Sequence, residues 1–381
     1  MKRISFIFSL LIFQFSFADQ LSINVFSLEN IITTHFTVNK GSYKVMSDSV
    51  ELGSIEAGTL LKFSLKEKNL HFILQGKSYS RKSILLKAAD PSACFKITTN
   101  TKHRHYEESL KLTAFSKTIQ LVNIVDLEKY VAGVVESEAG YKLTDEYYKL
   151  QAIICRTYAM KNIHRHELDG FQLCDNVHCQ AYYGRSQKVT SIINATMATS
   201  GMIITDTKLD LIDATFHSNC GGQTCNSEDV WSKEVPYLRS VTDTFCTKSK
   251  NANWKKVIPK QKWNSYLKSI GIENVGDTII DGEIFYVSSE ERVANIYFPN
   301  GKIKAAQMRN DLHLKSAYFE VKPKNDSIYI IGKGYGHGVG MCQEGAMKMA
   351  KLGYTYSQII NFYFQNVLIL NLSSLEFFRK D

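Results

Sequence analysis

The stretch Leu121-Val-Asn-Ile-Val-Asp-Leu-Glu-Lys-Tyr-Val-Ala-Gly-Val-Val-Glu-Ser-Glu138 decides how the centre of the chain folds. Its first five residues are mostly apolar and β-branched, and they predict a strand. Asp126 then opens a short helix, and its acid lies at the end where the helix dipole favours anions. Thr144 is the expected N-cap of a second, long helix, whose apolar stripe repeats at helical spacing from Leu150 to Tyr158. The centre of the chain therefore mixes α and β structure.

The composition is that of a globular protein. Its 381 residues leave room for two or three structural units, since a domain typically takes about 100–200 residues. Apolar residues make up 44% and charged residues 22%, with only 5 prolines, which excludes disordered, collagen-like and coiled-coil classes. The 46 basic residues exceed the 37 acidic ones by 9, or by 7 without Lys2 and Arg3. This surplus of positive charge suits binding to an anionic polymer such as cell wall, but ordinary solubility explains it equally well. The lysines are dispersed along the chain, so the sequence does not indicate binding to nucleic acid.

The N-terminus has the pattern of a secretory signal peptide. A basic head is followed by an almost unbroken apolar run from Ile4 to Phe17, and small residues at Ser16 and Ala18 suit cleavage after Ala18. A retained membrane anchor would need about 20 apolar residues, and this run is shorter. We therefore expect residues 1–18 to be removed, leaving an exported periplasmic or cell-wall associated protein with no transmembrane span.

The rest of the chain divides into four expected parts. Residues 19–105 form a small β-rich module, 106–250 the core, 251–325 an α/β subregion of the same domain, and 326–381 the C-terminal part of the core. The subregion has a helix over 261–270 and a strand over 293–298 that turns at Pro299-Asn-Gly. In the last part, a strand over 328–331 precedes a helix ending at Gly353 and a helix beginning with a capping box of Thr355 and Gln358. The predicted fold class is α+β, with mostly antiparallel strands and a few helices forming a cleft.

Glycine falls at every second position from Gly332 to Gly340. At the period of a strand, this pattern predicts one face without side chains, which another backbone or a polymer can approach closely. A phosphate-binding loop is excluded, because no window fits G-x-G-x-x-G and no Gly-Lys-Ser/Thr follows. His337 would then project from the opposite face, either as a hydrogen-bonded structural residue or as a group that polarises a substrate.

Two kinds of side chain could carry chemistry. The serine-hydrolase motif G-x-S-x-G and the metalloprotease motif H-E-x-x-H are both absent. Glu136 and Glu138 lie two residues apart before the long helix. An extended segment would put both side chains on one face, whereas a turn need not do so. The pair could serve in acid–base catalysis, and the alternative is that both are ordinary surface charges. Eight cysteines include two matched pairs, Cys174-x4-Cys179 and Cys220-x4-Cys225, which suit either metal or disulfides in an exported protein.

Several segments together resemble the SpoIID/LytB family of bacterial cell-wall proteins, which includes lytic transglycosylases. The similarity spans roughly 115–370 in order. It rests on the quoted stretch with Leu150-Gln-Ala-Ile-Ile-Cys-Arg-Thr-Tyr-Ala159, on Phe216-His-Ser-Asn-Cys-Gly-Gly222 with Val235-Pro-Tyr-Leu-Arg-Ser-Val-Thr-Asp243, and on Gly334-Tyr-Gly-His-Gly-Val-Gly-Met-Cys-Gln343. Family members often carry Met-Pro where Ala139-Gly140 stand, and Ser and a large aromatic residue where Cys342 and Glu344 stand.

The resemblance implies roles for individual residues. Glu138 matches the family's catalytic acid, whereas Glu136 is off the motif. Arg156, Tyr158, His337 and Gln343 would line the cleft and bind substrate, with a structural ion pair as the alternative for Arg156.

Some family members bind zinc after the long helix, and the matching residues here are His166, Cys174 and Cys179. His164 or His178 could replace His166, and Cys220 could add a fourth thiolate, since zinc favours thiolate and imidazole ligands. The alternatives are a disulfide of Cys174 with Cys179 or with Cys220, and a separate Cys220–Cys225 bridge.

The expected activity is that of a lytic transglycosylase, acting on the β-1,4 bond between N-acetylmuramic acid and N-acetylglucosamine in denuded glycan strands. One glutamate suffices for this reaction, because the muramoyl O6 hydroxyl attacks its own anomeric carbon. The competing interpretation is a non-catalytic protein that binds peptidoglycan and enhances a partner amidase, for which Glu138 would not be needed. A division scaffold that binds partners but not glycan is a third.

Overall fold

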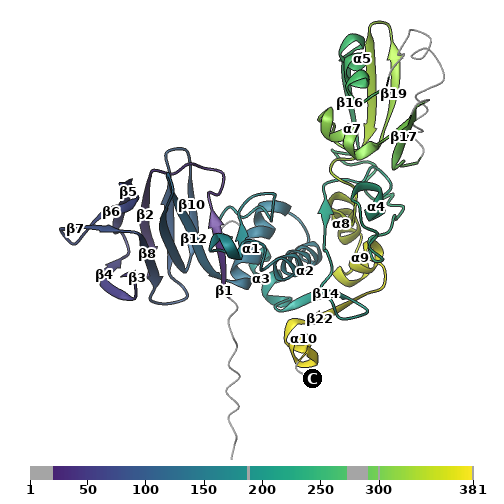
Figure 1. Ribbon diagram of the computed structural model, residues 1–381. Helices are drawn as coiled ribbons and strands as arrows, with labels where there is room; N and C mark the ends of the chain where they lie inside the picture. The colour runs from purple at the N-terminus through teal and green to yellow at the C-terminus, as the bar shows by residue number, and fades with distance from the viewer. Residues whose placement is uncertain (1–19, 187–188, 273–290, 299–300, 380–381) are drawn as a thin grey trace, which may run out of the picture.

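The computed structural model describes residues 20–186, 189–272, 291–298 and 301–379 (Figure 1). The expected signal peptide lies outside these residues. Figure 1 shows a β-rich part at one end, a helical centre, and a smaller lobe of strands and helices at the other end. No helix in the described ranges is both long and apolar enough to cross a bilayer. The mixed α+β class with mainly antiparallel pairing is confirmed.

Two sheets pack face to face through alternating buried side chains in the N-terminal part. The seven-stranded sheet has the order β13-β1-β12-β11-β8-β3-β4, and the six-stranded sheet the order β10-β9-β2-β5-β6-β7. The β-rich structure does not end at residue 105 as expected, because three later strands (β11, β12 and β13) complete the first sheet. The strands are β1 (Gln20–Val25), β2 (Thr33–Lys40), β3 (Ser42–Ser47), β4 (Val50–Glu56), β5 (Leu60–Lys66), β6 (Asn69–Leu74), β7 (Lys77–Arg81), β8 (Ser83–Ala88), β9 (Cys94–Thr98), β10 (His103–Glu107), β11 (Ser109–Phe115), β12 (Thr118–Asp126) and β13 (Leu173–Cys174).

Two helices at the centre begin at the predicted caps. Asp126 accepts hydrogen bonds from the first-turn amides of α1 (Leu127–Ala139), and Thr144 accepts one from Tyr147 in α2 (Asp145–Lys161). Helix α1 runs on to Ala139, because nothing stops it before Gly140, which has a φ of 73°. The two glutamates therefore lie in the last turn of α1, and the expectation of an extended segment or turn there is wrong.

Arg156 on α2 is fully buried and forms an ion pair with Glu128 on α1. It also donates to the carbonyls of Thr196 in α3 (Thr190–Ala198) and Met202 in β14 (Met202–Asp206). These bonds leave the guanidinium no surface to offer a sugar. The structure thus favours the ion-pair alternative for Arg156 over the predicted contact with substrate.

The glycine-rich segment is not a strand beyond Lys333, where β20 (Ser327–Lys333) ends. Gly334, Gly336, Gly338 and Gly340 all have positive φ, between 70° and 113°, a conformation that side-chain-bearing residues rarely adopt. A Cβ at Gly334 or Gly340 would lie 2.6 or 2.4 Å from a carbonyl oxygen of the segment 215–221. The predicted close approach of another backbone to the glycines is therefore observed, but the glycines form a loop and not a strand.

The smaller lobe has its own apolar core around Trp263. Its elements are β16 (Asn253–Pro259), α5 (Lys260–Ser269), β17 (Asn295–Phe298), β18 (Gly301–Lys304), α7 (Ala305–Asp311), β19 (Phe319–Lys324) and β20. The helix predicted at 261–270 is confirmed within one residue, whereas Pro299 and Asn300 of the predicted turn lie outside the described residues.

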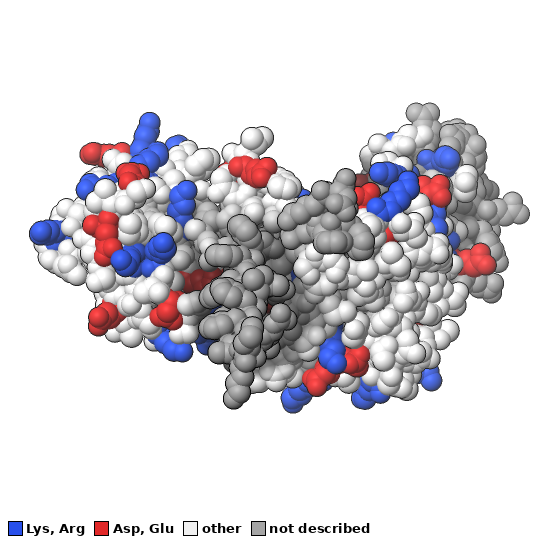
Figure 2. Space-filling view, turned by 90° about the horizontal axis from the view of Figure 1, so that it is seen from below, with Lys and Arg blue, Asp and Glu red and all other residues white. Residues whose placement is uncertain are grey.

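Short elements complete the core and the C-terminus. They are η1 (Glu167–Asp169), β15 (Phe216–His217), α4 (Ser227–Val230), β21 (Met341–Cys342), α8 (Gln343–Lys351), α9 (Tyr356–Tyr363), β22 (Val367–Asn371) and α10 (Leu372–Arg379). The capping box of Thr355 and Gln358 is present, and Gly353 follows the end of α8 with a φ of 94°. On the face shown in Figure 2, basic and acidic side chains are interspersed over the described residues.

Candidate functional site

Glu138 lies half-buried at the C-terminal end of α1. Its Oε1 accepts a hydrogen bond of 3.1 Å from the amide of Ala181. Burial raises the pKa of this carboxyl above its ordinary value, and the single bond from Ala181 only partly opposes that effect. The negative end of the helix dipole acts in the same direction as burial. These surroundings favour a protonated carboxyl that can give up its proton to a bound ligand.

Glu136 points to another side of the same helix end, because two positions differ by about 200° around a helix axis. Its Oε2 accepts a hydrogen bond of 2.7 Å from Ser186, and it lines a cavity of about 530 Å³. The other lining residues come from β10, α1, the loop after α1 and the segment 183–185: His103, Arg104, His105, Gly133, Ser137, Tyr141, Tyr183, Gly184 and Arg185. The two glutamates therefore do not face a common space.

A cluster of histidine and cysteine side chains follows α2. One donor atom from each of its four residues lies within 4.8 Å of the others: His166, Cys174, His178 and Cys179. The Sγ of Cys179 is 3.6 Å from Nε2 of His166 and 3.8 Å from Nδ1 of His178, and Sγ of Cys174 is also 3.8 Å from that Nδ1. A tetrahedral site with metal bonds of about 2.0–2.3 Å separates its donors by roughly this much. The cluster can hold a metal ion.

The other ligand candidates are elsewhere. His164 is exposed and contacts Glu167. Cys220 lies with Cys246 and Cys342, and Cys225 lies beside Arg292. All eight cysteines are free thiols, so the structure pairs Cys220 with neither Cys174 nor Cys225, and Cys174–Cys179 is not a disulfide.

The remaining predicted cleft residues occupy different positions. Tyr158 is half-buried beside the histidine–cysteine cluster, where its hydroxyl accepts a 2.7 Å bond from Arg165 and donates to the carbonyl of His178 at 3.4 Å. Gln343 begins α8 and lies near Tyr147, which in turn is close enough to Glu138 to interact with its charge. Gln343 is thus linked to Glu138 through Tyr147, whereas the contacts of Tyr158 are with the segment after α2.

His337 is held from both ring nitrogens. Its Nε2 donates to the carbonyl of Phe216 at 2.9 Å, and its Nδ1 accepts a bond of 3.1 Å from the amide of Val339. Burial lowers the pKa of His337 to about 4, so the ring is neutral near neutral pH. These contacts match the structural alternative for this histidine.

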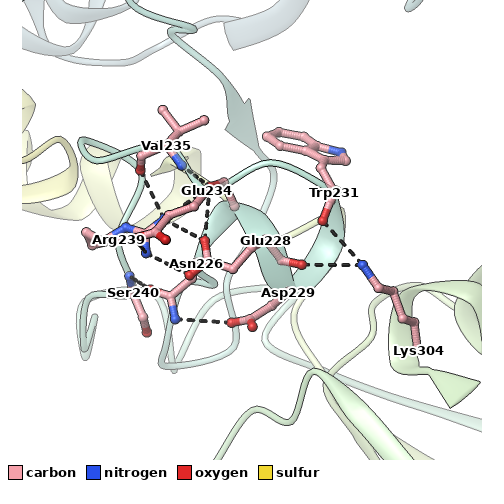
Figure 3. Close-up of polar contacts among 10 residues, drawn as sticks. Asn226, Glu228, Asp229, Trp231, Glu234, Val235, Arg239, Ser240 and Lys304 are labelled. Atoms are coloured by element: carbon pink, nitrogen blue, oxygen red, sulfur yellow. Dashed lines mark hydrogen bonds and ion pairs between the residues drawn. The ribbon is translucent and has the colours of Figure 1, made fainter. Parts of the chain in front are cut away.

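The indole of Trp231, which is 38% exposed, lies 5.4 Å from the His337 ring. Polar contacts fix the turn that carries it (Figure 3): Arg239 binds the carboxylate of Glu228, and Lys304 of β18 donates to the carbonyls of Glu228 and Trp231. In Figure 3, the Trp231 carbonyl faces Lys304 while the indole extends on the other side. A rigidly held, partly exposed aromatic ring is suited to stacking on a sugar.

Comparison with known proteins shows which family this chain is similar to. A family model described as "Stage II sporulation protein" matches residues 115–205. The stage II sporulation protein D of Bacillus amyloliquefaciens is 30% identical over 285 residues, covering 70% of this chain and 81% of that protein. The chain belongs to the SpoIID family. The stage II sporulation protein D of Bacillus subtilis is 31% identical over 271 residues, or 66% of this chain and 76% of that relative.

A second Bacillus subtilis relative, "Amidase enhancer", is 27% identical over 287 residues, covering 61% of this SpoIID-family chain and 39% of that longer protein. The family-model match contains Glu138 and the whole histidine–cysteine cluster, whereas His337 and Gln343 lie beyond it.

Sequence reasoning missed two features of the site. His178 was considered only as a substitute for His166, but the fold gathers both. The grouping of Cys220 with Cys246 and Cys342 was not foreseen, because no local spacing links residues so far apart in the chain.

We expect the stability effect of Glu138→Gln to depend on pH. A carboxyl with a raised folded-state pKa destabilises the fold once it ionises, by about 1.4 kcal/mol for each unit of difference from the unfolded state. The variant should therefore have a larger free energy of unfolding than the wild type at neutral pH, and this gain should disappear below about pH 4, where both states are protonated. Denaturant titrations at both pH values measure this difference in the free energy of unfolding, and a variant that is less stable than the wild type only at neutral pH would contradict the raised pKa of Glu138.

Proposed function

We propose that this protein is an exported peptidoglycan lytic transglycosylase that cleaves the β-1,4 bond between N-acetylmuramic acid and N-acetylglucosamine in denuded glycan strands. Membership of the SpoIID family supports a cell-wall role. The observation that carries the proposal is the position of Glu138: half-buried at a helix C-terminus, with one amide donor and a raised pKa.

Glu138 acts first as general acid. With its pKa raised, the carboxyl is available in protonated form and can donate its proton to the glycosidic oxygen as the bond to the anomeric carbon breaks. The leaving N-acetylglucosamine then departs as an alcohol, and the resulting carboxylate accepts a hydrogen bond from Ala181.

The same residue then acts as base. The muramoyl O6 hydroxyl attacks its own anomeric carbon, and Glu138 takes the O6 proton, which restores the acid and closes the 1,6-anhydro ring. Because the attack is intramolecular, no enzymic nucleophile or activated water is needed. Glu136 points to another side of α1 and so is poorly placed to act as the second carboxylate that glycoside hydrolysis uses.

The cavity that Glu136 lines offers surfaces for a glycan. Tyr141 and Tyr183 in the cavity are 48% and 54% exposed and can stack on sugar rings, and Arg185 can bind a carboxylate. Tyr158 and Gln343 are the proposed neighbours of the scissile bond. Arg156 and His337 are assigned the supporting roles that their internal bonds indicate.

We also assign a structural zinc ion to His166, Cys174, His178 and Cys179. The donor set and the 3.6–3.8 Å separations suit zinc, which would act by cross-linking the segment after α2. Cys179 lies two residues before Ala181, the donor to Glu138. The ion would therefore hold that amide against the catalytic carboxyl.

The second candidate is a non-catalytic enhancer of a cell-wall amidase. It is favoured by the likeness to the relative named "Amidase enhancer". An enhancer would bind glycan and stimulate an amidase without needing the Glu138 proton. The two candidate functions therefore predict different effects of the Glu138→Gln substitution.

Glu138→Gln should lower glycan cleavage by about 10²–10⁴-fold or more while glycan binding is retained, because the amide keeps the shape and the bond from Ala181 but cannot transfer a proton. Glu136→Gln is the matched control and should change the rate little. Cleavage of purified strands, with and without stem peptides, and a strand-binding assay measure both effects. Equal loss in the two variants would move the acid to Glu136, and stimulation of an amidase without any cleavage would favour the enhancer.

Cys174→Ser and Cys179→Ser should each remove about one zinc ion per chain, since each deletes a thiolate ligand. His164→Ala, at an exposed position outside the cluster, should leave the metal content unchanged. Elemental analysis of the purified full chain gives the count. Unchanged zinc in both cysteine variants would remove the assignment.

A further inference from the structure

A second group of metal-binding side chains lies in the core, apart from the first cluster. Its members share complete burial and donor atoms that all lie within 4.8 Å of one another: Cys220, Asp243, Cys246 and Cys342, hereafter the second cysteine cluster. The Sγ of Cys220 is 3.3 Å from both the Sγ of Cys246 and Oδ2 of Asp243. Three thiols and a carboxylate thus converge on one point.

The four residues come from three distant segments. Cys220 follows β15, Asp243 and Cys246 share one loop, and Cys342 ends β21 and caps α8. The pairing of β15 with β21 brings the first and third segments together. Such convergence is produced by the tertiary fold and not by any local turn.

We propose that the second cysteine cluster binds a structural zinc ion. Zinc takes four ligands in a tetrahedron, with metal–sulfur bonds of about 2.3 Å, so its sulfur ligands lie roughly 3.8 Å apart. The donor separations of 3.3 Å to at most 4.8 Å need only small side-chain adjustments to reach this geometry. Each thiol that binds releases its proton, so binding is coupled to pH.

The charge of this site is reasonable for a buried zinc centre. Three thiolates, one carboxylate and Zn²⁺ carry the same formal charge as the Cys₄ sites common in proteins. The amides of Cys220 and Gly345 donate to the Sγ of Cys342 at 3.3 and 3.4 Å. These bonds direct positive dipoles at a sulfur that would be a thiolate.

The Asp243 carboxylate is held in the same way. Asp243 accepts a bond of 2.8 Å from the hydroxyl of Tyr363 through Oδ2 and one of 2.9 Å from the amide of Phe245 through Oδ1. Ligands of structural metal ions typically carry such orienting bonds.

A disulfide is the main alternative in an exported protein. It would join only two of the sulfur atoms, most readily Cys220 with Cys246, and would leave the Cys342 thiol and the Asp243 carboxyl buried beside it. A metal ion uses all four groups and explains why they meet. We therefore favour zinc, and the disulfide is an outcome of the test.

Zinc at this position would tie together three segments behind the proposed active site. It would fix the start of α8, where Gln343 follows Cys342, and would pin the segment 215–221 against the glycine-rich loop. This role is structural, so it stands whether or not the protein cleaves glycan.

The test is a metal count on the full chain, isolated from an oxidising compartment of zinc-supplemented cells. The wild type should hold roughly two zinc ions per chain, and the Cys174→Ser/Cys179→Ser double variant should keep about one. Cys342→Ser should lose about one ion while the first site keeps its own. Replacing the remaining zinc of the double variant with Co²⁺ should give the visible absorption of a tetrahedral thiolate site.

The count also decides the case if a variant fails to fold. A wild type without zinc overturns the proposal, as does a double variant that folds without metal. A disulfide among Cys220, Cys246 and Cys342, found by peptide mapping without reduction, overturns it as well.

Discussion

The chemistry proposed for Glu138 depends on the hydrogen bond that the amide of Ala181 donates to its carboxyl at the end of α1. A carboxylate that received two or three such bonds would be a stable anion, and one that received none would be poorly oriented. With one donor and partial burial, the carboxyl is positioned and yet remains protonated more readily than a surface glutamate. This balance is what proton transfer to a sugar oxygen and back requires.

The rest of the core holds the two sides of that bond in place. On one side, the buried pair of Arg156 and Glu128 locks α1 to α2, and breaking such a pair typically costs about 3–5 kcal/mol. On the other side, Ala181 lies two residues after Cys179 of the histidine–cysteine cluster. The carboxyl is therefore placed by a helix pair and its donor by a loop that a metal ion could fix.

Local signals in the sequence were sufficient for several elements. Asp126 and Thr144 cap α1 and α2 as expected, and Thr355 caps α9, because a cap depends on the three residues that follow it. The resemblance to the SpoIID/LytB family pointed to His166, Cys174 and Cys179, and the structure gathers these three with His178 in one cluster that could hold a metal ion.

Tertiary features were not accessible in this way. Alternating glycines are consistent with a strand, but close contact with the segment 215–221 gives four of them positive φ and a loop. Glu136 and Glu138 could share a face only if the chain were extended there, and α1 continues through both. Cys220, Cys246 and Cys342 meet through the pairing of β15 with β21 and a separate loop, which no spacing reveals.

The central claim, that one glutamate promotes attack by the substrate's own O6, is tested most directly by the mass of the products. Purified glycan strands are incubated with the protein in isotope-labelled water and the fragments are analysed by mass spectrometry before and after borohydride treatment. Transglycosylation should give 1,6-anhydro-muramic ends that carry no label, weigh one water less than hydrolysed ends and resist reduction. Reducible muramic ends that contain labelled oxygen would show hydrolysis and contradict the central claim.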